Sequence, residues 1–404
     1  MTTGALSGLK VVELGNMVSA PFCGKLLSSL GAEVIKIEKP GTGDDARREG
    51  PFPRDIPNPE CSGLFLYVNA GKLGITLNLE TETGLSILRT LIRDADILVE
   101  NNLPREMKRL GLEYNKLKVI NPALIMTSIT PFGYTGPYRD YKATDLISFH
   151  AGGLGYITPR PVVGLPDEGP LRTRGHVADF IAGLDAAAGT MCVLYERDRT
   201  GTGQHLEISE QESVAVSIAT LFSGNSYSGH TNTRAGAAPY QPVATLPCKD
   251  GYVDIQCMTE EQWQRLVELM GDPDWAHLDI FKDVFSRAEN WETLEPLLSD
   301  WLSSKGKQEF FREAQAERVP TAPVNTVEDV VRSDHLAARR FFVESDHPVA
   351  GTLQYPGPVM KLSQTPPDTG GRAPLLGEHN EEVLCGRYGY DSEDLSKMKS
   401  TGVI

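Results

Sequence analysis

The chain has 404 residues, more than one compact hydrophobic core usually holds, so we expect two domains. Hydrophobic residues make up 40% of the chain and charged residues 23%, as in an ordinary globular protein. A formal net charge of -15 argues against binding to nucleic acid or to an anionic membrane surface, because both need a basic face. A local basic pocket for a phosphorylated ligand stays open, since net charge does not fix how charge is distributed.

The sequence shows no signal for targeting or for metal binding. Residues 1–10 lack the basic and apolar regions of a secretion signal, and the apolar runs are far shorter than the roughly 20 residues of a membrane span. The six cysteines form no CxxC pair, and the eight histidines show no HxxxH or HExxH spacing. We therefore expect a cytoplasmic protein with free thiols and no metal site.

The first part of the chain alternates short apolar strands with helices. Strands are predicted at residues 9–14, 33–38, 75–79, 96–100 and 124–129, and helices at 21–30, 82–93 and around 117. Pro21 suits the first turn of a helix, where its missing N–H is not needed. This alternation predicts a mostly parallel sheet wrapped by helices, with ligands at the carboxyl ends of the strands.

The middle of the chain begins with a glycine- and proline-rich stretch at 130–170, long enough to be a functional loop. Asp179 precedes a predicted helix of small residues at 180–196, which a strand at 204–208 and a helix at 210–221 follow. The intervening TGTGQ runs from helix to strand, whereas phosphate loops run from strand to helix. We interpret it as a structural turn.

A second, smaller α+β domain is predicted after a glycine-rich linker at 224–242. The Lys249-Asp250-Gly251 turn predicts a hairpin, and amphipathic helices follow at 260–270 and 291–303. The chain then leads back toward the first domain, and the proline-rich tail at 351–373 is expected to lie along a surface. The expected domain bounds are 1–223, 224–330 and 331–404.

Residue types alone identify no site. The loop after the first strand holds one glycine, Gly15, and not the GxGxxG of a dinucleotide site, which disfavours a redox enzyme of the Rossmann type. Asp179, at the start of its helix, is expected to be the N-cap. Four cations are expected to be solvated surface charges: Lys39, Lys72, Arg109 and Lys142.

Ten segments in order resemble the class III CoA-transferase family (formyl-CoA transferase and carnitine CoA-transferase, CaiB/BaiF-like), which includes benzylsuccinate CoA-transferase-like members. Among them are GLKVVELGNMVSAP, LLSSLGAEVIKIEKPGTGDDAR, NAGKLGITLNL, NPALIMTSITPFGYTGPY, GHVADFIAGLDAAAG and APLLGEHNEEVL. The resemblance implies an α/β fold with a Rossmann-like large domain formed by both ends of the chain. It also implies a smaller α+β domain and an interlocked dimer, either a homodimer or a heterodimer with a related chain.

The resemblance further implies a reaction and a site. The substrates are an acyl-CoA and a small carboxylic acid, with no tightly bound cofactor. Asp179, in GHVAD, is the implied nucleophile, whose carboxylate forms a mixed anhydride with the donor acyl group and then an aspartyl-CoA thioester. The implied CoA-binding residues are Val18, Lys39, Leu77, Asn101, Leu103, Arg109 and Lys142.

The resemblance leaves two alternatives for the function and suggests a class of substrate. A 2-methylacyl-CoA racemase would need a histidine where Thr144 stands, and His150 lies six positions on. A non-catalytic CoA-binding subunit of a heteromeric transferase is the second alternative. Aromatic residues in 130–170 and 224–242 favour a bulky or aromatic acyl group, and Arg172 or Arg174 is a candidate to bind the second carboxylate of a donor such as succinyl-CoA.

Overall fold

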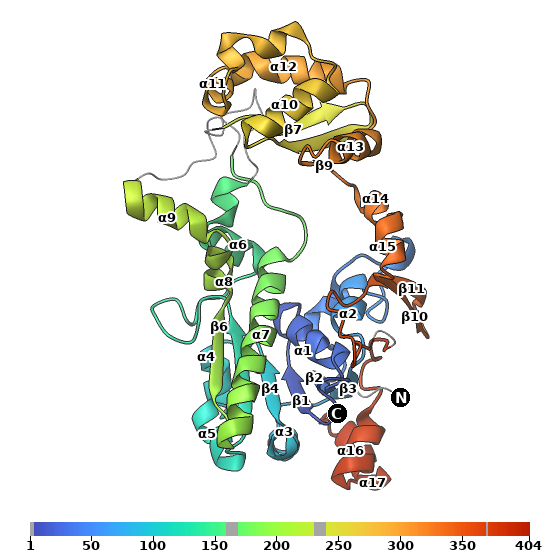
Figure 1. Cartoon of the computed structure of the whole chain (residues 1–404). Coiled ribbons are helices and arrows are strands. Elements are labelled where there is room, and N and C mark those ends of the chain that lie inside the picture. The colour runs from blue at the N-terminus through green and yellow to red at the C-terminus, as the bar shows by residue number, and fades with distance from the viewer. Residues whose placement is uncertain (1–3, 159–168, 230–239, 369–370) are drawn as a thin grey trace. The chain divides into compact units, whose positions relative to one another are not determined.

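The computed structural model describes residues 4–158, 169–229, 240–368 and 371–404, and the chain forms two compact units (Figure 1). The first unit comprises residues 1–156, 171–231 and 337–404, and the second comprises 157–170 and 232–336. Both ends of the chain thus belong to the first unit. The bounds expected from the sequence, 1–223, 224–330 and 331–404, stay a prediction about domains.

The first unit is built on a six-stranded parallel sheet in the order β3-β2-β1-β4-β5-β6. Its strands are β1 (Lys10–Leu14), β2 (Glu33–Glu38), β3 (Leu73–Thr76), β4 (Ile97–Glu100), β5 (Ile125–Thr130) and β6 (His205–Ser209). Val11 on the central strand lies opposite Val34 of β2 on one side and Ile97 of β4 on the other. The predicted parallel sheet is confirmed, and its strand order is that of a Rossmann-like fold.

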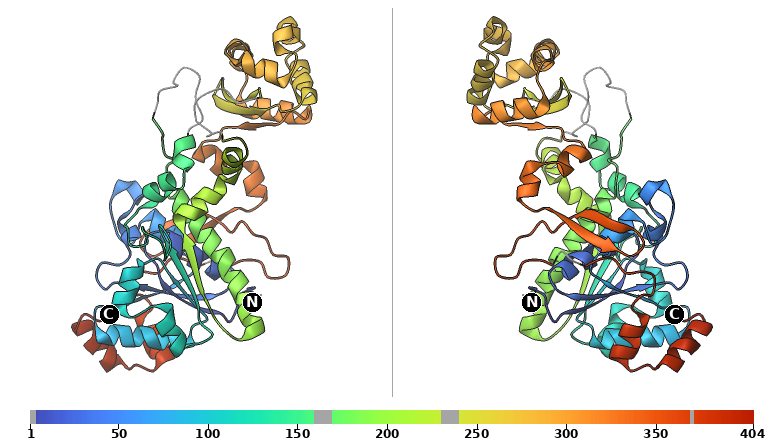
Figure 2. Two further views of the ribbon diagram at one scale, coloured as in Figure 1. Left: turned by 90° about the vertical axis from the view of Figure 1, so that its left-hand side faces the viewer. Right: turned by 90° about the vertical axis from the view of Figure 1, so that its right-hand side faces the viewer.

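Helices cover both faces of this sheet. The α-helices of the first unit are α1 (Ser19–Ser29), α2 (Gly63–Val68), α3 (Glu82–Asp94), α4 (Pro104–Leu110), α5 (Tyr114–Ile120), α6 (Asp145–Ala151), α7 (Val177–Thr200), α8 (Glu210–Ser217), α9 (Ala219–Ser228), α16 (Asn380–Tyr388) and α17 (Ser392–Ser400), of which α1 and α7 pack on one face and α3, α16 and α17 on the other. Because side chains alternate along a strand, Val12 joins the core formed with α3, α16 and α17, whereas Val11 joins the core formed with α1 and α7. Figure 2 shows α7 and the C-terminal helices on opposite sides of the sheet.

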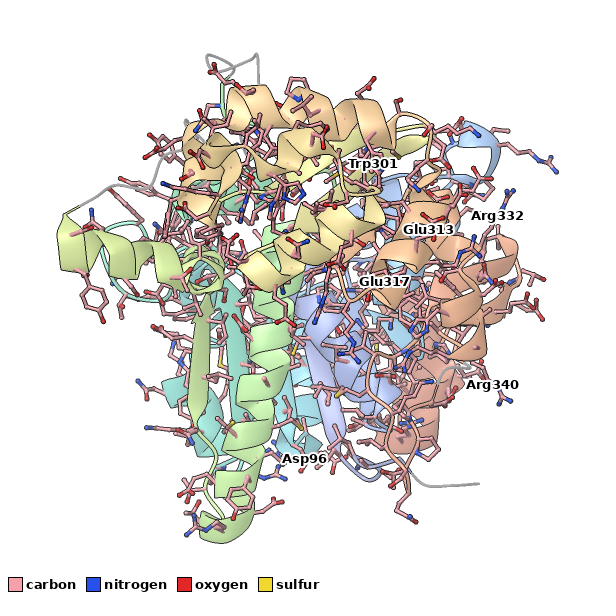
Figure 3. All side chains as sticks on the ribbon, turned by 45° about the horizontal axis from the view of Figure 1, so that its top comes forward. Asp96, Trp301, Glu313, Glu317, Arg332 and Arg340 are labelled. Atoms are coloured by element: carbon pink, nitrogen blue, oxygen red, sulfur yellow. The ribbon has the colours of Figure 1, made fainter. Side chains whose placement is uncertain are left out.

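The long helix α7 is held firmly against the sheet. Asp96, labelled in Figure 3, accepts hydrogen bonds from the backbone N–H of Lys10 and from the Arg197 guanidinium of α7, both at 2.8 Å. By length and composition alone α7 could cross a membrane, but half of its most apolar stretch is buried inside the protein. We interpret it as a core helix.

Two predictions about local structure are wrong, and one hairpin was not predicted. The third strand ends at Thr76, although the Leu77 N–H still bonds to the carbonyl of Glu38. The helix expected at 210–221 is two helices, because the backbone of Ile218 leaves the helical region at φ -117° and ψ 25°. The described residues of the tail at 351–373 are mostly exposed, and this tail begins with an unpredicted strand, β11 (Gly351–Pro356), which pairs antiparallel with β10 (Phe342–His347).

The second unit contains an antiparallel sheet in the order β7-β8-β9. Its elements are β7 (Val243–Cys248), β8 (Gly251–Gln256), α10 (Glu260–Leu269), α11 (Val284–Glu289), α12 (Trp291–Leu302), α13 (Lys307–Ala316), β9 (Thr321–Pro323) and α14 (Val327–Val331), and α15 (Asp334–Ala338) leads back to the first unit. The predicted hairpin is confirmed, with Cys248 opposite Gly251. The fully buried Arg287 stacks over Trp263 and forms hydrogen bonds of 2.9 Å with Glu260, so its charge is compensated.

Candidate active site

The loop after β1 is held by hydrogen bonds to side chains in the loops that follow the neighbouring strands β4 and β2. Asn101, just after β4, accepts a hydrogen bond from the Asn16 N–H at 2.9 Å and donates one to the Asn16 carbonyl at 2.7 Å. Asp44 accepts the N–H of Met17 at 2.9 Å, where the backbone takes a positive φ of 62°. Since a positive φ is strained for a methionine, these bonds hold the loop in a shape that it would not adopt alone.

Beneath this loop lies a buried network of charges. Glu13 of β1 pairs with Lys36 at 3.1 Å and with Lys72 at 2.7 Å, and Lys36 also pairs with Asp44 at 2.7 Å. Lys72 was expected to be a solvated surface charge, and this prediction is wrong, because its side chain is fully buried. Burial lowers the pKa of Lys72 to about 8, partly offset by the charge of Glu13.

Asp179 lies in the first turn of α7 and is not its N-cap, which corrects the prediction from sequence. The N-cap position is His176, whose side chain makes no capping bond. Asp145, the first residue of α6, caps the helix instead: one of its oxygens accepts the N–H of Ala178 at 2.8 Å and that of Asp179 at 3.2 Å. The Asp179 carboxylate therefore does not cap the helix. It lies at the N-terminal end of α7, where the helix macrodipole favours negative charge.

Titratable groups from three segments surround Asp179. The His176 Nδ1 atom lies 3.3 Å from an Asp179 oxygen, and this hydrogen bond raises the pKa of His176. The pKa of Asp145 is raised by burial and by the charge of Asp179. Burial, and then the charge of Asp179, raise the pKa of Glu210 to about 7. Glu210 is buried, and it accepts a hydrogen bond of 2.7 Å from Ser148.

Asp179 faces a cavity of about 560 Å³ at the N-terminal end of α7. The cavity is lined by the loop after β1, the segment before α6, and the segment before α7. Of the predicted residues, Val18, Asn101 and Asp179 line it. Arg172 and Arg174 also line it and are exposed, so they supply the cationic side of an otherwise acidic site.

A second cavity, of about 580 Å³, lies at the carboxyl ends of β1 to β4, where parallel sheets usually bind ligands. It contains three of the predicted CoA-binding residues, Lys39, Leu77 and Arg109, and Asn16 lines both cavities. The Arg109 guanidinium is engaged with Glu80 through two hydrogen bonds of 2.7 Å and with Glu106 at 2.9 Å. Arg48 lines this cavity as well, which the sequence did not indicate.

Two predicted CoA-binding residues and the predicted aromatic rings lie elsewhere. Leu103 is the N-cap residue of α4 and Lys142 is exposed, and neither lines either cavity. No aromatic ring among the described residues of 130–170 and 224–242 lines the Asp179 cavity. Phe149 packs in the core, and the Tyr134 hydroxyl donates to Glu100 at 2.6 Å. Residues 159–168 and 230–239 of these loops lie outside the described residues.

The residues around Asp179 form the type of cluster that can hold a cation. Asp145, His176 and Asp179 each offer one ligand atom, and these atoms lie within 4.8 Å of one another. No metal-ligand spacing is visible in the sequence, because Asp145 lies far from His176 and Asp179 along the chain. His176 stands three residues before Asp179, a helical i, i+3 spacing that was a usable but unspecific signal. The expected absence of a metal stays a prediction.

Comparison with known proteins shows which family this chain belongs to. A sequence model of CoA-transferase family III matches residues 6–380. The succinyl-CoA–L-malate CoA-transferase beta subunit of Chloroflexus aurantiacus is 33% identical over 413 residues, covering 100% of this chain and 99% of the relative. The formyl-CoA:oxalate CoA-transferase of Streptomyces coelicolor is 33% identical over 425 residues, covering 100% of both chains.

Solved structures show the same fold. A CaiB/BaiF family protein from Brucella suis superimposes with a TM-score of 0.83 at 31% identity, covering 95% of this chain and 99% of the other. The family match spans nearly the whole chain, and the relatives match it from end to end. The chain therefore belongs to CoA-transferase family III and is an enzyme of the CoA-transfer type.

Proposed function

We propose that this enzyme moves CoA from a donor acyl-CoA to an acceptor carboxylic acid, with Asp179 as the covalent nucleophile. The observation that carries the proposal is the position of the Asp179 carboxylate, which faces a cavity while its helix is capped by another residue, Asp145. Its side chain is 11% exposed, so it is shielded from bulk water and still open to a bound substrate. A carboxylate in this setting is a suitable nucleophile toward a thioester.

The chemistry balances without any redox step. An Asp179 oxygen attacks the donor carbonyl, the C–S bond breaks, and CoA leaves as a thiolate from an acyl-aspartyl anhydride. The thiolate then attacks the aspartyl carbonyl, which forms an aspartyl-CoA thioester and releases the donor carboxylate. The acceptor carboxylate attacks the carbonyl of this thioester, so that the C–S bond breaks, CoA thiolate leaves and a second anhydride forms. The thiolate then attacks the acceptor carbonyl of that anhydride, which yields the acceptor acyl-CoA and frees the Asp179 carboxylate.

The two cavities suit the two parts of an acyl-CoA. We place the CoA nucleotide in the cavity at the strand ends, where Lys39, Arg48 and Arg109 offer cations to phosphate groups. The thioester would reach Asp179 past Asn16, which lines both cavities. Arg172 and Arg174 would bind a carboxylate of the donor or acceptor, and relatives named for succinyl-CoA, malate and oxalate support small dicarboxylates as substrates.

The test is CoA transfer from succinyl-CoA to a panel of small carboxylates by the wild-type chain and by Asp179→Asn. The variant should lose activity by at least a thousandfold, because an amide does not replace the nucleophile. Asp185→Asn is the matched control: Asp185 lies on the same helix but is exposed and lines neither cavity. Equal activity of Asp179→Asn and wild type would refute the proposal.

Two added assays, deuterium exchange in a 2-methylacyl-CoA and CoA transfer after addition of a related chain, separate the alternatives. A racemase would exchange the α-proton of a 2-methylacyl-CoA for deuterium without CoA transfer. His150, one candidate base from the sequence, is exposed and lines neither cavity. A non-catalytic subunit would bind CoA and show neither reaction until a related chain is added. The assay with an added related chain is included because two relatives are named as the beta and alpha subunits of one transferase.

A further inference from the structure

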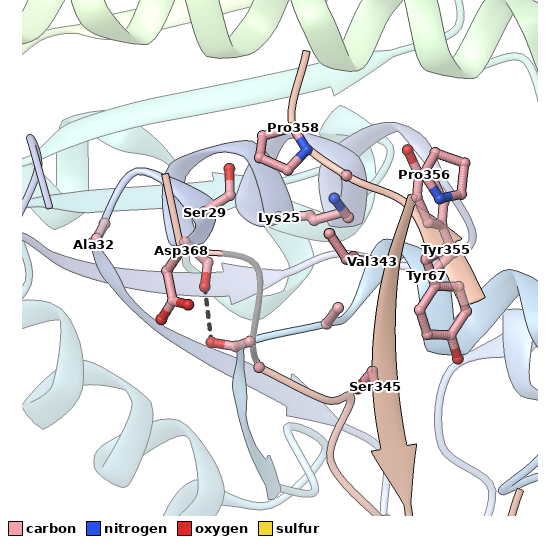
Figure 4. A pocket seen from close by; sticks show the side chains of 16 residues that line it. Lys25, Ser29, Ala32, Tyr67, Val343, Ser345, Tyr355, Pro356, Pro358 and Asp368 are labelled. Carbon is pink, nitrogen blue, oxygen red and sulfur yellow. Dashed lines mark hydrogen bonds between the residues drawn. The ribbon is translucent and has the colours of Figure 1, made fainter. Parts of the chain in front are cut away.

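A third cavity, of about 230 Å³, lies in the first unit away from the two cavities described above (Figure 4). It is lined by the last two turns of α1, by Tyr67 of α2, by β10 and β11, and by the chain that follows β11. It shares no lining residue with the Asp179 cavity or with the cavity at the strand ends. The rings of Phe22, Tyr67 and Phe180 contact one another, so Tyr67 packs against the first turn of α7.

The unusual feature of this cavity is Lys25. Its residue surface is 9% exposed, and within the described part of the chain its ammonium forms no ion pair and no hydrogen bond. Its one polar contact is with the face of the Tyr67 ring, at 4.7 Å from the ring centre. Burial of most of the side chain lowers the pKa of Lys25, and the open space next to it is the cavity that it lines.

Two other buried lysines of the same unit, Lys36 and Lys72, have carboxylate partners, whereas Lys25 has none among the described residues. Lys36 and Lys72 are more deeply buried than Lys25, and each is compensated by at least one carboxylate, Glu13 or Asp44, within 3.1 Å. Asp368 is the one acidic residue among those that line the third cavity, and it lies with Ala32 at the end opposite Tyr67 and Tyr355 in Figure 4. The fold therefore compensates its buried lysines with anions elsewhere and leaves Lys25 open toward a cavity.

We propose that this cavity binds the carboxylate group of a small organic acid, with Lys25 as its cationic anchor. The ligand carboxylate pairs with the Lys25 ammonium, and its apolar body lies toward Tyr67, Tyr355 and Val343. The tyrosine rings lie 6.4 Å apart and present an aromatic wall. One cation and an apolar wall suit a monocarboxylate better than a phosphate, which takes more donors.

The size of the cavity limits the ligand. Its volume of about 230 Å³ is below the roughly 300–1,000 Å³ of pockets for drug-sized ligands, so an acyl-CoA does not fit and a free acid does. The site thus differs in ligand from the two cavities assigned to the CoA ester. Its occupation by a free acid does not depend on the transfer reaction, and the proposal stands or falls independently of the role of Asp179.

The test is calorimetric titration of the wild-type chain with benzoate, with neutral benzamide as the control ligand. We expect benzoate to bind with a millimolar or lower dissociation constant and benzamide to bind at least tenfold more weakly. Lys25→Met, which keeps an unbranched side chain one atom shorter and removes the charge, should weaken benzoate binding at least tenfold. Lys10→Met is the matched control, since Lys10 is exposed and lines none of the three cavities.

Two further variants keep the test decisive. Val343→Phe retains Lys25 and fills the cavity, so it should also weaken binding at least tenfold even if Lys25→Met proves poorly folded by circular dichroism. The double variant Arg172→Gln, Arg174→Gln removes the cations of the Asp179 cavity and should leave benzoate binding unchanged. Wild-type protein that binds no benzoate at millimolar concentrations would overturn the proposal. So would binding that survives Val343→Phe or disappears in the double arginine variant.

Discussion

Replacing Glu210 with glutamine should make the first unit more stable at neutral pH. Glu210 is buried beside Asp179, and its pKa is raised from 4.5 to about 7, first by burial and then by the charge of Asp179. Because the folded pKa of this acid lies above its unfolded value, the folded state holds more protons between these two pH values. The stability that Glu210 contributes is therefore greatest below pH 4.5 and is lost as the pH rises through 7.

The size of the effect follows from the same shift. At about 1.4 kcal/mol for each pKa unit, the change from 4.5 to about 7 corresponds to roughly 3 kcal/mol of lost unfolding free energy by pH 8. Glutamine keeps the shape and its oxygen can still accept the hydrogen bond from Ser148, but it carries no charge. Glu210→Gln should thus match wild type near pH 4.5 and exceed it by up to about 3 kcal/mol at pH 8.

The assay is urea unfolding at several pH values from 5 to 8, followed by two signals. All four tryptophans lie in the second unit, so their fluorescence reports that unit, whereas far-ultraviolet circular dichroism reports the helices of both. The gain should be seen by circular dichroism and not by fluorescence. Glu212→Gln, at an exposed position of the same helix, should show no such pH dependence. A constant difference between Glu210→Gln and wild type across this pH range would refute the reasoning.

Three other substitutions test separate parts of the structure. Glu13→Gln should lower the unfolding free energy by about 3–5 kcal/mol in urea titrations, because it leaves Lys36 and Lys72 without their shared buried partner. As the control, Glu33→Gln at the partly exposed ion pair with Arg387 should cost under about 1 kcal/mol. Arg109→Ala should raise the KM for the acyl-CoA roughly tenfold with little change in kcat. Glu80→Gln, which frees Arg109 from its ion pair, should lower that KM. An unchanged KM in both variants would contradict phosphate binding by Arg109. Arg287→Met should shift the tryptophan-monitored transition to lower urea by leaving a space and an unpaired Glu260, and a shift confined to the circular dichroism signal would contradict this.

The parallel sheet was predictable because its signal is local. Each strand from β1 to β5 is a short apolar run between helical segments, and that rhythm alone predicts alternating strands and helices. The hairpin of β10 and β11 was missed, because the prolines and glycines around Gly351–Pro356 conceal a strand with few apolar residues. The break at Ile218 was missed as well, since the apolar pattern runs through it without a glycine or proline.

The candidate site was predictable only in part, for a different reason. Asp179 was identified through the resemblance and not through its own chemistry, which suggested an N-cap. The structure gives that duty to Asp145, which no spacing along the chain relates to Asp179. Glu210 likewise reaches the site from the start of α8, and the burial of Lys72 depends on Glu13 from another strand. Such relations arise from tertiary packing, so periodicity and motif spacing do not contain them.

The central claim, covalent catalysis by Asp179, is tested most directly by trapping the enzyme intermediate. The chain would be incubated with succinyl-CoA, treated with hydroxylamine or borohydride, digested, and mapped by mass spectrometry. The account predicts a modified Asp179, present in wild type and in Asp185→Asn, and absent without the acyl-CoA. Transfer of CoA to an acceptor with Asp179 unmodified at every time point, or with the label on another residue, would contradict it.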